Sequence, residues 1–290
     1  MSYSHFGQIG DIWKHLPLCS FLRNEAPRKY VESNSACAHY LLDHTPEQQY
    51  GVDTFLNRSS SSPALAKAPF VDMLRSLNAG PDLTRYLGSP GLAMTLMQKR
   101  AQQYTFFDLD RNALANVDDY ARYLKLSRRV MTRNEDSLEG VHRLLGELSP
   151  SDFIHFDPYF AFEKNRYGRN YFDVFLEATR KKIKGMLWYG YNTLEQQALA
   201  RQFMASALDT SGLDRHTHNI RGIEIILSAI TCGEPTYNPG IMACGVLTGN
   251  LSAKSLGEFD ALSNALVEIY KGVKMNANTV NGELYKEVIF

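Results

Sequence analysis

The chain has 290 residues, no net formal charge, 44% hydrophobic residues and 21% charged residues. This composition is ordinary for a globular protein and allows one large α/β domain or two small ones. It lacks the basic surplus that nucleic-acid-binding proteins usually carry, although a local basic patch could serve the same purpose. No apolar run approaches the roughly 20 residues of a membrane-spanning helix. Since the first residues also lack the layout of a signal peptide, we expect a cytoplasmic protein.

The cysteines give no sign of a metal site. Cys19, Cys37, Cys232 and Cys244 are widely spaced, whereas structural zinc sites normally use close Cys-x-x-Cys pairs. We therefore predict no metal site, and thiols that are reduced and mostly buried, as suits a reducing compartment.

The first elements in chain order resemble the opening of a nucleotide-binding unit. A helix is predicted over residues 9–22 and a short apolar strand over 29–31, ending at Glu32. Small residues at 33–38 then lead into 39–42, which is expected to begin a helix. Strand, tight turn and helix is the typical start of a βα unit that binds a nucleotide.

The next stretch, residues 45–85, differs in character. It contains four consecutive serines, several prolines and short amphipathic pieces such as 70–77. This pattern predicts a helical insertion within one domain that spans residues 1–290.

The remainder alternates between strands and helices. Strands are predicted at 104–107, 130–132, 153–156 and 185–189, and helices at 88–102, 112–124, 171–182 and 194–207, with another running through 145. Two segments rich in β-branched residues, 220–230 and 241–248, are separated by glycines and prolines and predict a hairpin. The fold class is therefore α/β and Rossmann-like, a mostly parallel sheet with a C-terminal antiparallel β-hairpin.

Acidic residues lie at the ends of four successive predicted strands, namely Glu32, Asp108, Asp136 and Asp157. In an open α/β sheet, ligands bind beyond the carboxyl ends of the strands, where the strand order reverses. Helix capping explains about half of such acidic residues. It does not explain an acid before a small-residue turn, or an Asp-Pro pair after a strand.

These strand ends suggest a nucleoside ligand. The turn after Glu32 could let the backbone approach a ligand, although Ala36 and Ala38 stand where dinucleotide folds use glycine. Asp108 is placed to accept hydrogen bonds from ribose hydroxyls. Asp136, with Ser137, could bind an adenine amino group.

The strongest single motif is Asp157, Pro158, Tyr159 and Phe160 after an apolar strand. This arrangement is typical of amino-directed methyltransferases, in which the carboxylate and the proline carbonyl accept hydrogen bonds from an amino group while the aromatic ring stacks on the base. The nitrogen lone pair then faces the methyl donor, S-adenosylmethionine (SAM). The alternative is a strand-to-turn junction with a buried tyrosine.

In scattered blocks over nearly its whole length, the chain resembles the RlmJ family, bacterial methyltransferases that act on adenine N6 of large-subunit ribosomal RNA. The matching blocks are residues 5–15, 30–38, 86–90 (Tyr-Leu-Gly-Ser-Pro), 157–160 and 187–189 (Leu-Trp-Tyr), together with Asp108 and Asp136. The resemblance implies a class I SAM-dependent methyltransferase fold, with the 5–15 block helping to enclose the cofactor.

The departures from that family are specific. Its Gly-x-Gly loop is Ala36-Cys37-Ala38 here, and alanine is tolerable there only with negative φ. Tyr159 replaces the second proline of its Asp-Pro-Pro-Tyr. These changes indicate a divergent member and leave open a small-molecule acceptor, a reaction within SAM itself, or a non-catalytic binding module.

We therefore predict a SAM-dependent N-methyltransferase acting on an adenine amino group in RNA, with a small-molecule SAM enzyme as the alternative. The catalytic set is Asp157, Pro158, Tyr159 and Phe160. The cofactor-binding set is His5, Lys14, His15, Glu32, Asn34, Ala36, Ala38, Ser89, Asp108, Leu109, Asp136 and Ser137.

One further loop combines basic and aromatic residues. Lys164, Arg166, Tyr167 and Arg169 follow the Asp-Pro motif and could clamp phosphates or stack bases. A solvated loop without function explains them equally well.

Overall fold

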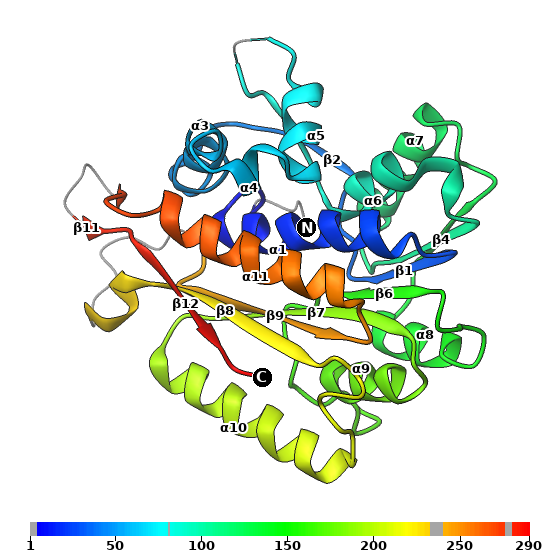
Figure 1. Ribbon diagram of the computed structural model, residues 1–290. Helices are drawn as coiled ribbons and strands as arrows, with labels where there is room; N and C mark the ends of the chain where they lie inside the picture. Colours follow the sequence, from blue (N-terminus) through cyan, green and yellow to red (C-terminus); the bar gives the residue numbers. More distant parts are fainter. Residues whose placement is uncertain (1–4, 81, 233–239, 276–279) are drawn as a thin grey trace.

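The computed structural model describes residues 5–80, 82–232, 240–275 and 280–290. A central eight-stranded sheet lies between two layers of helices (Figure 1). No helix in the described ranges is long and apolar enough to cross a membrane.

The sheet has the order β12-β8-β9-β7-β6-β1-β4-β5. Its strands are β1 (Lys29–Ser33), β4 (Gln103–Phe107), β5 (Val130–Arg133), β6 (Phe153–Phe156), β7 (Lys184–Tyr191), β8 (Arg221–Leu227), β9 (Ala243–Gly249) and β12 (Leu284–Val288). The five strands from β7 to β5 are parallel, and β9 runs antiparallel to both of its neighbours. Chain order reverses where β1 lies beside β6, so the expected ligand crevice is at their carboxyl ends.

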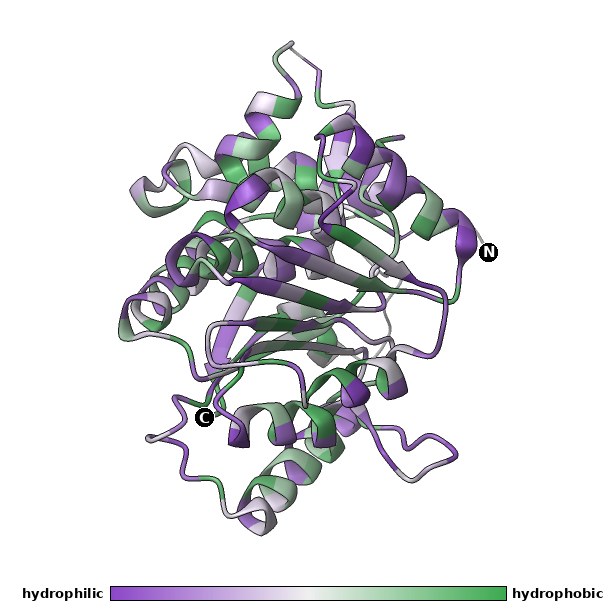
Figure 2. Cartoon of the chain, turned by 90° about the vertical axis from the view of Figure 1, so that its right-hand side faces the viewer, coloured by the Kyte–Doolittle hydropathy of each residue, from purple (hydrophilic) through white to green (hydrophobic). Residues whose placement is uncertain are grey.

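The helices form one layer on each face of the sheet. Their bounds are α1 (Ile9–Glu25), α6 (Ser89–Met97), α7 (Arg111–Tyr123), α8 (Ser137–Leu144), α9 (Tyr171–Arg180), α10 (Leu194–Ser211) and α11 (Ala253–Ile269). Helices α1 and α11 lie side by side on one face, and α9 and α10 cover the other (Figure 1). Apolar and polar residues are both present along the helices, as expected for elements with one buried side (Figure 2).

Helix α1 is the central helix of its layer. Every residue from Ile9 to Leu22 is buried, and Trp13 stacks on Phe259 of α11 with ring centroids 5.4 Å apart. Its amino-terminal half therefore lies in the interior, where polar side chains need partners.

Short helices occupy residues 46–77, within the expected insertion. They are α2 (Pro46–Gln48), η1 (Gln49–Asp53), α3 (Thr54–Ser59), α4 (Pro63–Ala66) and α5 (Pro69–Leu77). Segments α5 and η1 pack on α1, so the insertion lies against the same helix that faces the crevice.

The predicted helix at 39–42 is wrong. Residues 39–41 form β2 (His39–Leu41), which pairs antiparallel with β3 (Arg85–Leu87). Tyr40 stacks on Phe6 at 4.3 Å. These tertiary contacts keep residues 39–41 extended. Three residues are too few to show the alternating hydrophobic pattern that predicts a strand.

Both strands of the predicted hairpin are present, but they pair with further strands of the large sheet. β8 and β9 pair antiparallel, yet β9 also pairs with β7, and β12 forms the edge beside β8. The small strands β10 (Lys274–Met275) and β11 (Val280–Asn281), like α11 and β12, were not predicted. The turn signals at 233–239 and the Cys232 side chain lie outside what the structure describes.

The helix predicted over 88–102 is shorter than expected. It ends at Met97, because Gln98 adopts φ +47° and begins the 3₁₀ turn η2 (Gln98–Arg100).

Candidate functional site at the carboxyl edge of the sheet

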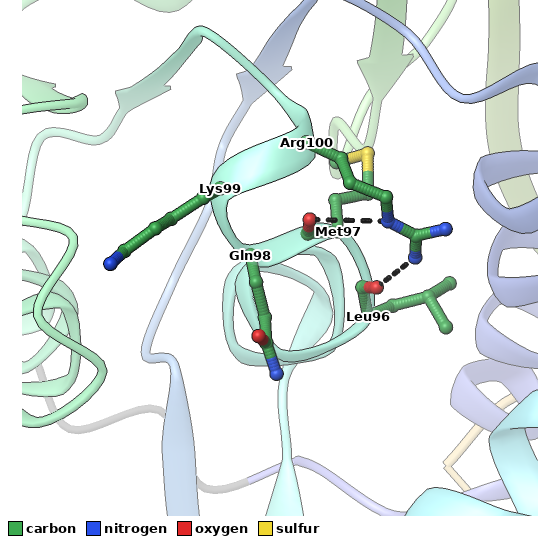
Figure 3. Close-up of a pocket in the computed structure, with 5 residues that line it drawn as sticks. All are labelled: Leu96, Met97, Gln98, Lys99 and Arg100. Carbon is green, nitrogen blue, oxygen red and sulfur yellow. Dashed lines mark hydrogen bonds between the residues drawn. The ribbon is translucent and has the colours of Figure 1, made fainter.

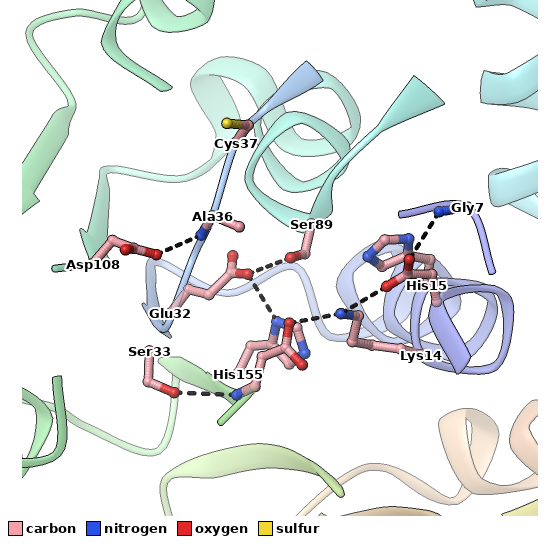
Figure 4. Close-up of polar contacts among 12 residues, drawn as sticks. Gly7, Lys14, His15, Glu32, Ser33, Ala36, Cys37, Ser89, Asp108 and His155 are labelled. Carbon is pink, nitrogen blue, oxygen red and sulfur yellow. Dashed lines mark hydrogen bonds and ion pairs between the residues drawn. The ribbon is translucent and has the colours of Figure 1, made fainter. Parts of the chain in front are cut away.

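Lys14 of α1 joins two carboxylates near the carboxyl ends of β1 and β6, where the ligand crevice is expected (Figure 4). Its Nζ lies 2.7 Å from Asp157 Oδ2 and 3.0 Å from Asp11 Oδ1, and about a tenth of each side chain is exposed. It also lies over the Trp188 ring, 5.4 Å from the centroid. Burial disfavours the ammonium, but the charges of Asp157 and Asp11 outweigh it and raise the pKa of Lys14 above its usual value. Lys14 is therefore a permanent cation beside Asp157.

Asp11 completes this cluster. Burial raises the pKa of its carboxyl group, an effect that Lys14 partly offsets. The other Asp11 oxygen accepts a hydrogen bond from the Gly7 amide at 2.9 Å, which fixes the segment leading into α1.

The Asp-Pro motif directly follows β6. The Asp157 amide donates to Ser33 Oγ at 3.1 Å, which joins the ends of β6 and β1. Asp157 Oδ1 accepts no hydrogen bond from any residue that the structure describes. Tyr159 is 84% and Phe160 55% exposed, with their rings 4.6 Å apart and nearly perpendicular. The alternative of a buried tyrosine at this junction is therefore wrong.

Glu32 is fully buried beneath the crevice. It accepts hydrogen bonds from Ser89 Oγ and from Tyr30 OH at 2.8 Å, and its Oε1 lies 3.2 Å from His155 Nδ1 (Figure 4). Both of its oxygens are thus bound to protein groups, and its direct effect is to position Ser89 at the start of α6.

The loop after β1 folds onto Asp108. The Ala36 amide donates to Asp108 Oδ2 at 2.8 Å, and the Asp110 amide donates to Oδ1 at 2.8 Å. Asn34 and Ala36 have φ values of +54° and +52°. Ala36 therefore does not meet the condition of negative φ, whereas Ala38 does, and the left-handed region costs a non-glycine residue about 1–2 kcal/mol.

Two glycines of α6 and its cap permit close packing on this loop. A Cβ at Gly88 would lie 2.2 Å from the Cys37 carbonyl oxygen, and one at Gly91 would lie 2.1 Å from that of Ala38. The Tyr-Leu-Gly-Ser-Pro segment, residues 86–90, and the first turn of α6 therefore pack closely against the loop after β1.

Asp136 and Ser137 begin α8 at the rim of the crevice. Asp136 is exposed, and its Oδ1 accepts from the Leu138 and Glu139 amides at 2.9 and 3.2 Å, which is an ordinary N-cap. Ser137 Oγ donates to Asn34 Oδ1 at 3.0 Å and hydrogen-bonds Tyr171 OH at 2.7 Å. Ser137 thus ties α8 to the loop after β1.

Three other predicted residues make no contact with Asp157 among the described interactions. His5 is exposed, with Nδ1 3.0 Å from Glu47 Oε2, and Leu109 is 75% exposed. His15 is buried, with Nδ1 2.7 Å from Tyr86 OH, and burial lowers its pKa well below 6.5. Its ring packs against Phe70 of α5 and Tyr86 of β3, with centroids 5.9 and 5.7 Å away, so it contacts the insertion.

Sequence reasoning missed Asp11, Ser33 and His155. Asp11 had a usable signal, because it precedes Lys14 by three positions on a helix. Ser33 and His155 carried none, since strand pairing alone brings them beside Asp157 and Glu32.

Two shallow hollows lie elsewhere on the protein. One, of about 500 Å³, is lined by Leu96 to Arg100 at the end of α6, where Arg100 donates to the Met97 and Leu96 carbonyls (Figure 3). The other, of about 410 Å³, is lined by insertion residues that include His44 and Asp53. Neither hollow is lined by any of the predicted site residues, so we locate the site by its side chains. Among the described residues, no three His, Cys, Asp or Glu side chains are grouped to hold a metal ion.

No protein-family model and no curated protein sequence matches this chain. Among solved structures, the Legionella pneumophila protein LPL1258, of family DUF519, superposes with a TM-score of 0.74 over 98% of this chain and 97% of that one, at 19% identity. An O-methyltransferase of Bacillus cereus in complex with SAH matches at 8% identity over 82% and 80%, with a TM-score of 0.41. The Streptomyces achromogenes O-methyltransferase TomG in complex with SAM also matches at 8%, over 81% and 79%, with a TM-score of 0.41. The fold is mixed α/β with a mostly parallel sheet, as the sequence predicted, and LPL1258 shares it over nearly the whole of both chains.

Proposed function

We propose that this protein is a SAM-dependent methyltransferase that acts on an adenine amino group in RNA, as a divergent relative of the RlmJ family. The observation that carries the proposal is the position of Asp157. Its carboxylate lies at the reversal point of the sheet, is held by Lys14 at 2.7 Å, and is followed by two exposed aromatic rings.

The residues at the crevice fit SAM in their chemistry. Asp108, at the end of β4, is the proposed partner of the ribose hydroxyls, with its two oxygens also accepting the Ala36 and Asp110 amides. Asp136 and Ser137 begin α8, where we place the adenine. Ser35 Oγ is buried and has no hydrogen-bond partner among the described residues, so the loop after β1 holds a polar group in need of one. When bound, SAM supplies an electrophilic methyl group.

In this proposal, Glu32 and the N-terminal residues act indirectly, by positioning other residues of the site. Glu32 positions Ser89 from beneath the crevice. The α1 end supplies Lys14, while His5 and His15 flank it on the insertion side.

The acceptor amino group is held by this chain's own atoms. Asp157 Oδ1 and the Pro158 carbonyl accept its N–H hydrogens, which directs the nitrogen lone pair away from them and toward the methyl donor. Lys14 balances the Asp157 charge without occupying Oδ1. Phe160 stacks on the base, and the amine proton leaves after nitrogen has gained the methyl group.

A small-molecule acceptor is the second candidate. The zero net charge of the chain favours it, because RNA binding benefits from positive charge. Tyr159 stands where the RlmJ family has its second proline, and this change in the motif that holds the acceptor also favours a different acceptor.

A cytoplasmic location belongs to the same proposal. Cys19, Cys37 and Cys244 are free thiols, and burial raises the pKa of Cys19 and Cys244. Unpaired thiols of this kind suit a reducing compartment.

The test is transfer of labelled methyl from SAM to ribosomal RNA that lacks base methylation, with Asp157→Ala and Asp157→Asn compared to wild type. We expect transfer by wild type, loss with alanine, and partial activity with asparagine, which keeps one acceptor oxygen. Transfer to no RNA, combined with methylation of a metabolite extract, would favour the second candidate. Release of methylthioadenosine from SAM alone would exclude methyl transfer.

A further inference from the structure

The loop between β6 and α9 has a fixed base. Asn165 Oδ1 accepts the amides of Tyr167 and Arg169 at 2.9 and 3.2 Å, and the Asn165 amide donates to the Arg169 carbonyl at 2.7 Å. Asn165 Nδ2 and the Arg169 guanidinium both donate to Glu139 of α8, at 2.8 and 3.1 Å. The loop is therefore tied both to itself and to the neighbouring helix.

Three side chains at the tip of this loop, Lys164, Arg166 and Tyr167, are exposed. Lys164 and Arg166 are exposed, and neither forms an ion pair within the described part of the chain. Tyr167 is 57% exposed, and the Arg166 guanidinium lies 4.8 Å from its ring centroid. Gly168 at φ +76° makes the turn that presents them.

We propose that this tip, formed by Lys164, Arg166 and Tyr167, binds single-stranded RNA next to Asp157. The inference rests on the proposed function, because it identifies the RNA acceptor as an unpaired segment. An unpaired base stacks on Tyr167 and its guanidinium partner, and Lys164 and Arg166 contact phosphates. The fixed loop base lowers the entropy cost of binding.

Single-stranded RNA fits these groups better than a duplex. Aromatic rings can stack only on bases that are already unstacked, whereas duplex RNA is read mainly through its backbone and hydroxyl groups. The local charge also agrees: because Arg169 pairs with Glu139, the loop presents Lys164 and Arg166 against Glu163 alone, in a chain of zero net charge.

The test measures binding of the full-length protein to a fluorescent single-stranded RNA of about 12 nucleotides by anisotropy, without SAM and at several salt concentrations. We expect Tyr167→Ala to weaken binding about tenfold. Lys164→Gln and Arg166→Gln should each lower the slope of log affinity against log salt by about 0.7.

Matched controls come from exposed residues elsewhere. Tyr123 is 77% exposed on α7, and Arg128 is exposed at the amino end of β5. Tyr123→Ala and Arg128→Gln should bind RNA like wild type. Wild-type affinity in the three tip variants, preference for duplex RNA, or no RNA binding by wild type would each overturn the inference.

The melting shift that SAM causes is measured on every variant. If SAM shifts all of them and the tip variants lose RNA, both proposals are supported. If SAM shifts none while the tip variants still lose RNA, the inference stands and the proposed function fails.

Discussion

Lys14 and Asp157 are separated by 143 positions in the sequence, yet their side chains meet at 2.7 Å. The contact joins the buried start of α1 to the end of β6. Because Lys14 also contacts Asp11, one cation serves two carboxylates, and it contacts Asp157 through Oδ2. The same contact therefore matters for folding and for the proposed chemistry.

Replacing Lys14 with methionine should destabilise the fold. The substitution leaves Asp11 and Asp157 without their cation, and breaking such a buried pair costs about 3–5 kcal/mol. The free energy of unfolding, measured by urea denaturation at pH 7.5, should fall accordingly. Adding Asp11→Asn should restore part of the loss, because burial already disfavours the Asp11 carboxylate. Equal stability of Lys14→Met and wild type would contradict this account.

His15 should make stability depend on pH. Burial, with smaller effects from Lys14 and His155, lowers its folded-state pKa well below 6.5. Below about pH 6.5 the unfolded chain therefore binds a proton that the folded chain does not, so its contribution is present above that pH and is lost as the pH falls. The loss can reach about 1.4 kcal/mol per pH unit.

Comparing wild type with His15→Gln isolates this effect. Urea denaturation between pH 7.5 and 5 should show a shallower pH dependence for the variant. Parallel curves would mean that folding leaves the pKa of His15 unchanged, which would contradict this account.

The sequence predicted the parts of the fold that depend on local pattern. The run at 153–156 is apolar and bounded by aspartates, and β6 has those same bounds. Helix α11 was missed, although Ser252 caps it and apolar residues such as Phe259 and Leu262 recur at helical spacing. The pairing of β2 with β3, the contact of Lys14 with Asp157 and the positive φ of Ala36 depend on tertiary packing, which no local pattern encodes.

Gly91→Ala should cost stability, whereas Gly257→Ala should add to it. A Cβ at Gly91 would lie 2.1 Å from the Ala38 carbonyl oxygen, so the loop after β1 would have to move, at a cost of about 1–3 kcal/mol. Gly257 lies in α11 with no atom within 4 Å of such a Cβ, and alanine there should gain up to about 1 kcal/mol. Thermal unfolding of both variants checks this, and a stabilised Gly91→Ala would show that the loop does not pack as described.

Ala36→Gly and Ala38→Gly should have opposite effects, although both restore a glycine of the family's loop. At Ala36, glycine relieves a left-handed conformation that costs alanine about 1–2 kcal/mol, and it adds about 0.5–1 kcal/mol of entropy loss, so stability should stay level or rise. Ala38 is fully buried with negative φ, so glycine there only adds entropy loss and removes a packed methyl group, at a cost of about 1–2 kcal/mol. Thermal unfolding with and without SAM measures both effects.

If the loop contacts SAM as proposed, Ala36→Gly should also enlarge the SAM-induced shift, because the Ala36 methyl group no longer crowds the ligand. Destabilisation of both variants by the same amount would mean that Ala36 bears no backbone strain.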